Sequence, residues 1–98
     1  MTALAPHLTA FLREHLPRER SASPHTVAAY AHSFTLLVRF AAARLKQRPT
    51  DLTVEDLDPE LVLAFLDHVE DKRRNGARTR NARLAAIRTF FLQNCLQY

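Results

Sequence analysis

Arginine, threonine and asparagine crowd one short segment in the second half of this 98-residue sequence. The residues in that segment are Arg78, Thr79, Arg80, Asn81 and Arg83. A guanidinium group fits phosphate oxygens or the edge of a guanine, and asparagine fits the edge of an adenine. Threonine can hold a phosphate. The chemistry that these side chains offer is therefore recognition of a polyanion, with nucleic acid as the leading candidate.

Charges around this segment are separated along the chain instead of being mixed. Residues 72–88 carry seven basic side chains, and no acid occurs after Asp71. Residues 51–71 carry eight acids and neither lysine nor arginine. This asymmetry predicts a polyanionic partner that approaches from one side. Part of the separation has a simpler origin, because a helix dipole favours acids near the N-terminus of a helix and bases near its C-terminus.

Composition favours one small all-α domain over residues 1–98. The single glycine and the lack of tryptophan argue against a sheet-rich fold, whereas alanine, leucine and arginine are strong helix formers. The lone Cys95 excludes an intrachain disulfide, and we expect it to be a small buried hydrophobe instead of a reactive thiol. There is no secretory signal and no apolar run of about 18 residues. We therefore expect a cytoplasmic protein without a membrane partner.

Hydrophobic spacing predicts four helices, at about residues 3–16, 24–47, 59–74 and 78–96, with a short turn over 54–57. Serine, threonine or aspartate caps predict the starts, and proline or glycine predicts the ends. The residues that set these boundaries are Pro17, Ser23, Pro24, Pro49, Thr53, Asp58, Pro59 and Gly76. Gly76 is expected to take a left-handed conformation after the third helix.

The fourth predicted helix carries most of the basic cluster. At about 100° per residue, its buried stripe is predicted to be Leu84, Ile87, Phe91 and Cys95, with Phe90 beside it. The opposite side would be a face of small residues that permits close approach to another helix or to a groove wall. Its members are Arg78, Ala82, Ala85, Ala86 and Thr89. The position of Arg80 around the helix is nearer to the predicted core side. Arg80 lies in the first turn, however, where a long side chain can extend beyond the end of the packed core.

No constellation of residues predicts catalysis by the chain itself. His15 and Arg18 form an H-x-x-R pattern, but no second histidine or tyrosine is suitably placed beside it. Gly-rich phosphate loops, nucleophile elbows and histidine–cysteine metal spacings are all missing from the sequence. We therefore expect no enzyme activity, metal, cofactor or small-molecule substrate.

Two spaced patterns resemble the N-terminal core-binding, SAM-like domain of the tyrosine recombinase and phage integrase family. The first is Ser23-x-x-Thr26-x-x-x-Tyr30-x-x-x-Phe34-x-x-x-Val38-x-Phe40. The second is Thr79-x-Asn81-x-Arg83-Leu84-x-Ala86-Ile87-Arg88-x-Phe90-Phe91. The resemblance extends from about residue 5 to residue 98, and the order and separation of the two patterns make it more specific than either alone.

The resemblance implies a small orthogonal bundle of four to five helices that forms one jaw of a clamp around double-stranded DNA. It implies DNA contacts from His25, Thr26, Arg78, Thr79, Arg80, Asn81 and Arg83, followed by Arg88, Lys72, Arg73 and Arg74. Tyr30 would lie near the DNA backbone or in the core. Neighbouring recombinase protomers on DNA are a further implied partner, and the family's catalytic domain would follow Tyr98.

A second class of function also fits the separated charges. The chain could be a helical protein–protein interaction module, in which the acidic third helix of one copy meets the basic fourth helix of another. Binding to random duplex DNA that weakens steeply with salt would distinguish DNA recognition from this alternative.

Overall fold

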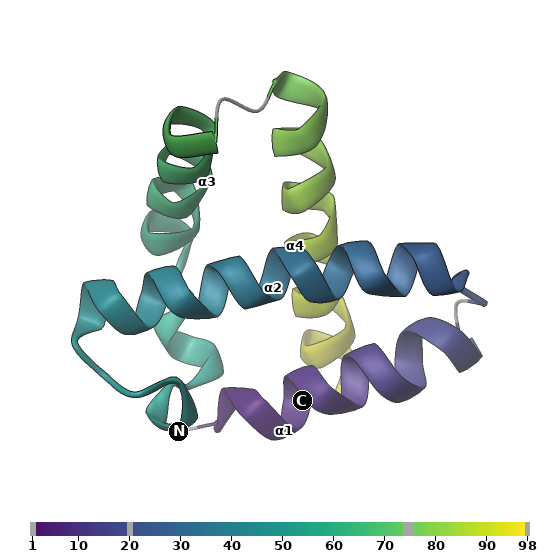
Figure 1. The fold of residues 1–98 in the computed structure, drawn as a ribbon. Coiled ribbons are helices and arrows are strands. Elements are labelled where there is room, and N and C mark those ends of the chain that lie inside the picture. Colours follow the sequence, from purple (N-terminus) through teal and green to yellow (C-terminus); the bar gives the residue numbers. More distant parts are fainter. Residues whose placement is uncertain (1, 20, 74–75, 98) are drawn as a thin grey trace.

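Helices make up nearly all of the structure, a computed structural model that describes residues 2–19, 21–73 and 76–97, with side chains except at 19, 72, 73 and 93–97. The elements are α1 (Leu4–Ala10), the π-helix η1 (Phe11–Glu19), α2 (Pro24–Leu45), the 3₁₀ turns η2 (Pro49–Asp51) and η3 (Val54–Asp56), α3 (Pro59–Arg73) and α4 (Ala77–Gln97). In Figure 1, α2 lies across both α3 and α4, and the continuous helix formed by α1 and η1 runs below it. This arrangement confirms the predicted all-α orthogonal bundle.

Local capping explains why the helices begin where they do. The Ser23 Oγ accepts the N–H of Thr26 at 3.2 Å, with Pro24 in the first helical position of α2. The Asp58 Oδ1 accepts the N–H of Leu61 at 2.8 Å at the start of α3. Thr53 closes a capping box over η3. These three starts were predicted from the sequence and are confirmed.

Two expected boundaries are wrong. The first helix does not end at Pro17 but passes through it to Glu19 as η1. A π-helix has a wider turn than an α-helix, which relieves the clash that a proline ring makes with the turn before it. Gly76 does not adopt a positive φ. Its carbonyl instead accepts the N–H of Arg80 at 3.2 Å, so Gly76 caps the start of α4.

Three phenylalanines from three different helical segments form the centre of the core. Phe90 of α4 meets Phe11 of η1 with ring centroids 5.3 Å apart and Phe34 of α2 at 5.4 Å, both edge to face. Phe11 and Phe34 also pack edge to face, at 6.0 Å. Edge-to-face packing aligns the positive edge of one ring with the negative face of another. This aromatic junction therefore fixes where α2 and α4 cross.

We expect two leucine substitutions of identical chemistry to separate the core from the surface. Leu37 is 0% exposed and Leu92 is 61% exposed. Leu37→Ala should lower the free energy of unfolding by about 2–5 kcal/mol, because it leaves a cavity. Leu92→Ala should change it by no more than about 0.5 kcal/mol. Urea denaturation followed by circular dichroism measures both, and equal losses would contradict this core.

The beginning of the described chain is held against the segment before α3. The Leu4 N–H donates to the Leu52 carbonyl at 3.0 Å, and the Val54 N–H donates to the Thr2 carbonyl at 2.8 Å. The Thr2 N–H donates to the Glu55 Oε2 at 3.1 Å. Hydrogen bonding from Thr2 is the main reason that the pKa of Glu55 is lowered to about 2.

The lowered pKa of Glu55 predicts a specific loss of stability in acid. Because the folded-state pKa is below the unfolded value of about 4.3, the stabilising contribution of Glu55 is complete above that value. It is lost as the pH falls towards about 2. Thermal midpoints of the wild type and Glu55→Gln should therefore differ at neutral pH and converge in acid. A constant difference across this range would contradict the assigned hydrogen bond.

Candidate nucleic-acid interface

The leading end of α4 places polar and basic side chains in solvent. Arg78 and Asn81 are exposed there, and Thr79 is half-buried. The first N–H groups of a helix have no partner within the helix, and they carry the positive end of the helix dipole. Arg78 adds a full positive charge at the same place. An anion would therefore be attracted to this end of α4.

The open side of α4 differs from the one predicted. Between residues 78 and 88 the exposed residues are Arg78, Asn81, Ala82, Ala85 and Arg88, which we call the exposed α4 face. Ala86, which was expected on the open side, is 1% exposed and belongs to the core. Leu84 and Phe91, expected to be buried, are only partly covered. The exposed α4 face contains two arginines, one asparagine and two alanines, and it lacks any acid.

Packing at the aromatic junction explains why α4 is rotated about its own axis relative to the prediction. Phe90 is completely buried against Phe11 and Phe34, so the side of α4 that carries Phe90 must face the core. Residues three and four positions before it, Ile87 and Ala86, lie on the same side of the helix and are buried with it. Hydrophobic periodicity alone predicted a buried side of α4 about a quarter of a turn away from the observed one. Alanine can lie on either the buried or the exposed side of a helix, so it did not distinguish the two.

Arg83 lies on the buried side of α4, away from the exposed α4 face. It is 6% exposed and is, among the side chains that the structure describes, one of the two buried polar or charged ones. Arg83 had been expected among the main DNA contacts from the family pattern. Its burial makes it part of the packing of α4, and a DNA contact from Arg83 stays a prediction.

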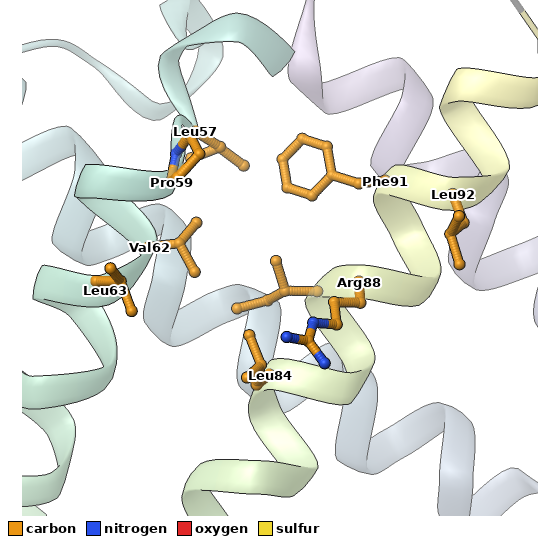
Figure 2. Close-up of a pocket in the computed structure, with 9 residues that line it drawn as sticks. Leu57, Pro59, Val62, Leu63, Leu84, Arg88, Phe91 and Leu92 are labelled. Carbon is orange, nitrogen blue, oxygen red and sulfur yellow. The ribbon is translucent and has the colours of Figure 1, made fainter.

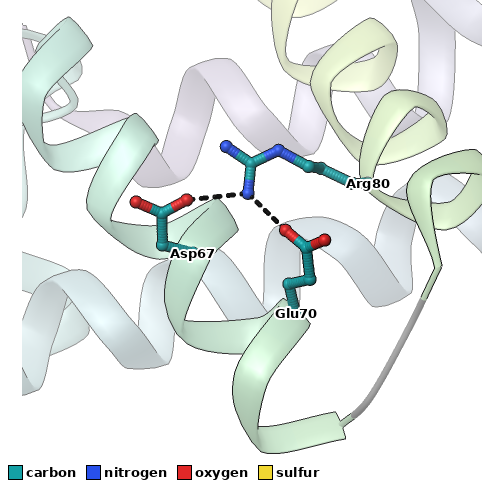
Figure 3. A network of polar contacts seen from close by, with 3 residues as sticks. All are labelled: Asp67, Glu70 and Arg80. Atoms are coloured by element: carbon teal, nitrogen blue, oxygen red, sulfur yellow. Dashed lines mark hydrogen bonds and ion pairs between the residues drawn. The ribbon is translucent and has the colours of Figure 1, made fainter.

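Arg80 is held by two acids of α3, as Figure 3 shows. Its Nη1 donates to the Asp67 Oδ1 at 2.8 Å and to the Glu70 Oε2 at 2.7 Å. The pKa of Arg80 is raised, chiefly by the hydrogen bond to Asp67, while partial burial acts in the opposite direction. These acids lie 13 and 10 residues earlier in the sequence, on another helix, so helical periodicity could not identify them.

The leading end of α2 forms a second polar patch. His25 and Thr26 are both exposed, and the Thr26 Oγ1 lies 3.1 Å from the Ser23 Oγ of the cap. Tyr30, one turn further along, is half-buried and stacks on Phe11 with ring centroids 6.3 Å apart. Tyr30 therefore belongs to the edge of the core, which was one of the two places expected for it.

The exposed polar residues at the start of α2 (His25 and Thr26) and at the start of α4 (Arg78 and Asn81) form two patches, which we call the α2 patch and the α4 patch. Both lie far from the point where the two helices cross. At a rise of about 1.5 Å per residue, His25 is about 13 Å along α2 from Phe34. Arg78 is about 18 Å along α4 from Phe90 by the same measure. Phe34 and Phe90 pack together where these two helices cross. Of the predicted site residues, His25 and Thr26 thus lie at the start of α2, and Arg78, Thr79 and Asn81 lie at the start of α4.

Several expected site residues lie outside the part of the chain that can be assessed. Arg74 is outside the described residues, and the side chains of Lys72, Arg73 and Cys95 are too. Over the described ranges, no group of three histidine, cysteine or acidic residues could hold a metal ion. None of the helices, as far as they are described, is long and apolar enough to cross a membrane.

An apolar groove between α3 and α4 was missed by sequence reasoning (Figure 2). Its volume is about 620 Å³, and Leu63 and Leu92 on its lining are 55% and 61% exposed. The lining residues are Leu57, Pro59, Val62, Leu63, Leu84, Ile87, Arg88, Phe91 and Leu92. The available signal was that Leu92 is a leucine outside the predicted buried stripe of the fourth helix.

Comparisons with known proteins agree with this geometry. The profile of the family described as phage integrase, N-terminal SAM-like domain, matches residues 8–93. The chain is 51% identical over 88 residues to the y4rD protein of Sinorhizobium fredii, whose name assigns it to the integrases and recombinases. That match covers 90% of this chain and 31% of the relative.

A more distant relative has a more specific name. The chain is 36% identical over 91 residues to the tyrosine recombinase XerC of Pelobacter propionicus, which covers 93% of this chain and 28% of that protein. The chain therefore spans less than a third of the length of these relatives. No solved structure gives a significant match.

Proposed function

Because the chain belongs to the phage integrase N-terminal SAM-like domain family, we propose that it binds double-stranded DNA as the N-terminal clamp domain of a site-specific tyrosine recombinase. In this proposal the domain positions DNA for strand exchange, and a catalytic domain elsewhere in the recombinase cleaves and rejoins the strands. Neighbouring recombinase protomers on the same DNA would be its protein partners. The domain itself carries out no chemistry.

The exposed α4 face is the observation that carries this proposal. Arg78 and Arg88 lie ten residues apart on it, which is about 15 Å along the helix, and Asn81 lies between them. Ala82 and Ala85 are short, so they let the helix backbone approach a groove wall while the longer side chains reach forward. Arginine can contact phosphate or guanine, and asparagine can contact adenine.

The α2 patch and the size of the domain support the same proposal. His25 and Thr26 stand exposed at a positive helix end, where a phosphate is favoured. The longest dimension of the domain is 34 Å, close to the length of about one turn of B-DNA. The α2 and α4 patches can therefore contribute to one binding surface only if they contact different parts of a duplex. The sequence alone adds three further proposed DNA contacts, Lys72, Arg73 and Arg74.

A salt titration with random-sequence duplex DNA tests the proposal. We expect affinity to fall linearly on a log–log plot against salt, because each phosphate contact releases counterions. Arg78→Ala and Arg88→Ala should each reduce the magnitude of that slope by about 0.9. Arg39→Ala is the matched control, since Arg39 is an exposed arginine on the side of α2 that faces α3. Fluorescence anisotropy measures all four proteins, and a wild type that fails to bind at low salt would refute DNA binding.

The apolar groove favours a second candidate function, a helical protein–protein module. Leu63 on α3 and Leu92 on α4 expose apolar surface that a partner would cover. Glu60 is exposed on α3, and Arg88 lies on the α4 side of the groove. A two-fold axis through the groove would set the acidic α3 edge of one copy against the basic α4 edge of another. This matches the expected pairing of acidic and basic helices.

Under this second function, a charge placed in the groove should prevent self-association. Leu63→Glu and Leu92→Glu should each shift the chain to a monomer in sedimentation velocity, because they would bury an unpaired carboxylate at the interface. Ala28→Glu adds the same charge at an exposed position of α2 and should leave association unchanged. A wild type that is monomeric at every concentration would remove this candidate.

A further inference from the structure

The contact between Arg80 and the two acids of α3 changes what Arg80 can do for DNA. Asp67 and Glu70 are one turn apart on α3, and both carboxylates bind the same Nη1 of Arg80. The Arg80 side chain is 27% exposed, so most of it is covered by the α3–α4 contact. Two carboxylates around one guanidinium leave a local net charge of −1. A phosphate approaching Arg80 would meet this net negative charge.

The same contact ties the leading end of α4 to α3. Ile87 and Phe90 anchor the middle of α4 in the core, but Arg78 lies about 2.5 turns before Ile87 and Asn81 about 1.7 turns before it. Arg80 lies between these two exposed residues in the sequence and points to the two acids of α3 (Figure 3). The two ion pairs therefore restrain the turn that carries Arg78 and Asn81.

We propose that Arg80 is a positioning residue for the exposed α4 face and does not itself contact phosphate. This inference rests on the proposed DNA-binding function. Asp67 and Glu70 have two roles in this proposal. They hold Arg80 in place, and their remaining negative charge keeps the duplex from lying over α3. The basic cluster seen in the sequence then contains arginines with two different tasks, contact by Arg78 and Arg88 and positioning by Arg80.

The same substitution at two neighbouring arginines separates contact from positioning. Arg78→Gln should reduce the magnitude of the slope of log affinity against log salt by about 0.9, as expected for one lost phosphate contact. Arg80→Gln should weaken binding while leaving that slope unchanged, because no phosphate contact is lost. Its thermal midpoint should also fall, and circular dichroism is the check that the variant is folded.

A variant that keeps Arg80 provides the second arm. Asp67→Asn with Glu70→Gln removes both charges that hold the guanidinium and leaves similar shapes behind. The freed Arg80 should then be available to phosphate, so the slope should become steeper by about 0.9. A merely structural role for Arg80 would not produce this gain. This variant also keeps the proposal testable if Arg80→Gln does not fold.

Each outcome of these titrations supports or contradicts the proposed positioning role of Arg80. If Arg80→Gln lowers the slope as Arg78→Gln does, Arg80 is a phosphate contact and the proposal is wrong. If Arg80→Gln changes neither the slope nor the affinity, Arg80 does not position the face, and the proposal is also wrong. A wild-type chain that binds DNA with a steep slope retains the proposed function in both cases. A wild type that does not bind at all removes both.

Discussion

The packing of Phe90 against Phe11 and Phe34 is the constraint on which the rest of the structure depends. These rings come from three separate helical segments, so their contact sets both the crossing of α2 with α4 and the rotation of α4 about its own axis. That rotation decides which side chains meet solvent. It buries Arg83 and leaves Arg78 exposed, although both are arginines of the same helix. The chemistry of the surface is thus a consequence of aromatic geometry in the interior.

Sequence reasoning recovered what local interactions determine. Capping by Ser23 and Asp58 depends on atoms within one helical turn, so the starts of α2 and α3 could be predicted. Contacts between distant residues decided the rest. The partners of Arg80 lie on another helix, and the burial of Arg83 follows from how α4 packs. The family pattern identified the fold correctly, but it could not distinguish exposed from buried positions inside the α4 motif.

The acidic and basic segments, which are separate along the chain, meet in the folded structure where α3 contacts α4. Acids of α3 meet the basic helix directly through Arg80, so the acidic and basic segments are not two independent surfaces. Arg80 is neutralised at this boundary, whereas Arg78 and Arg88 lie on the exposed α4 face. A net count of basic residues therefore overstates the charge available to a partner. The position of each arginine relative to α3 is the more informative quantity.

Ala82 and Ala85 also affect how a domain of this kind can change over evolutionary time. Both are exposed on α4, and alanine has the highest helix propensity, so neither contributes to the core and both support the helix. Substitutions there would alter what the helix presents to a partner at little expense to folding. The buried positions beside them, Ala86 and Phe90, have no such freedom. Within one helix, positions where a substitution would leave the core intact thus alternate with positions that the core requires, so new recognition preferences could arise on an unchanged scaffold.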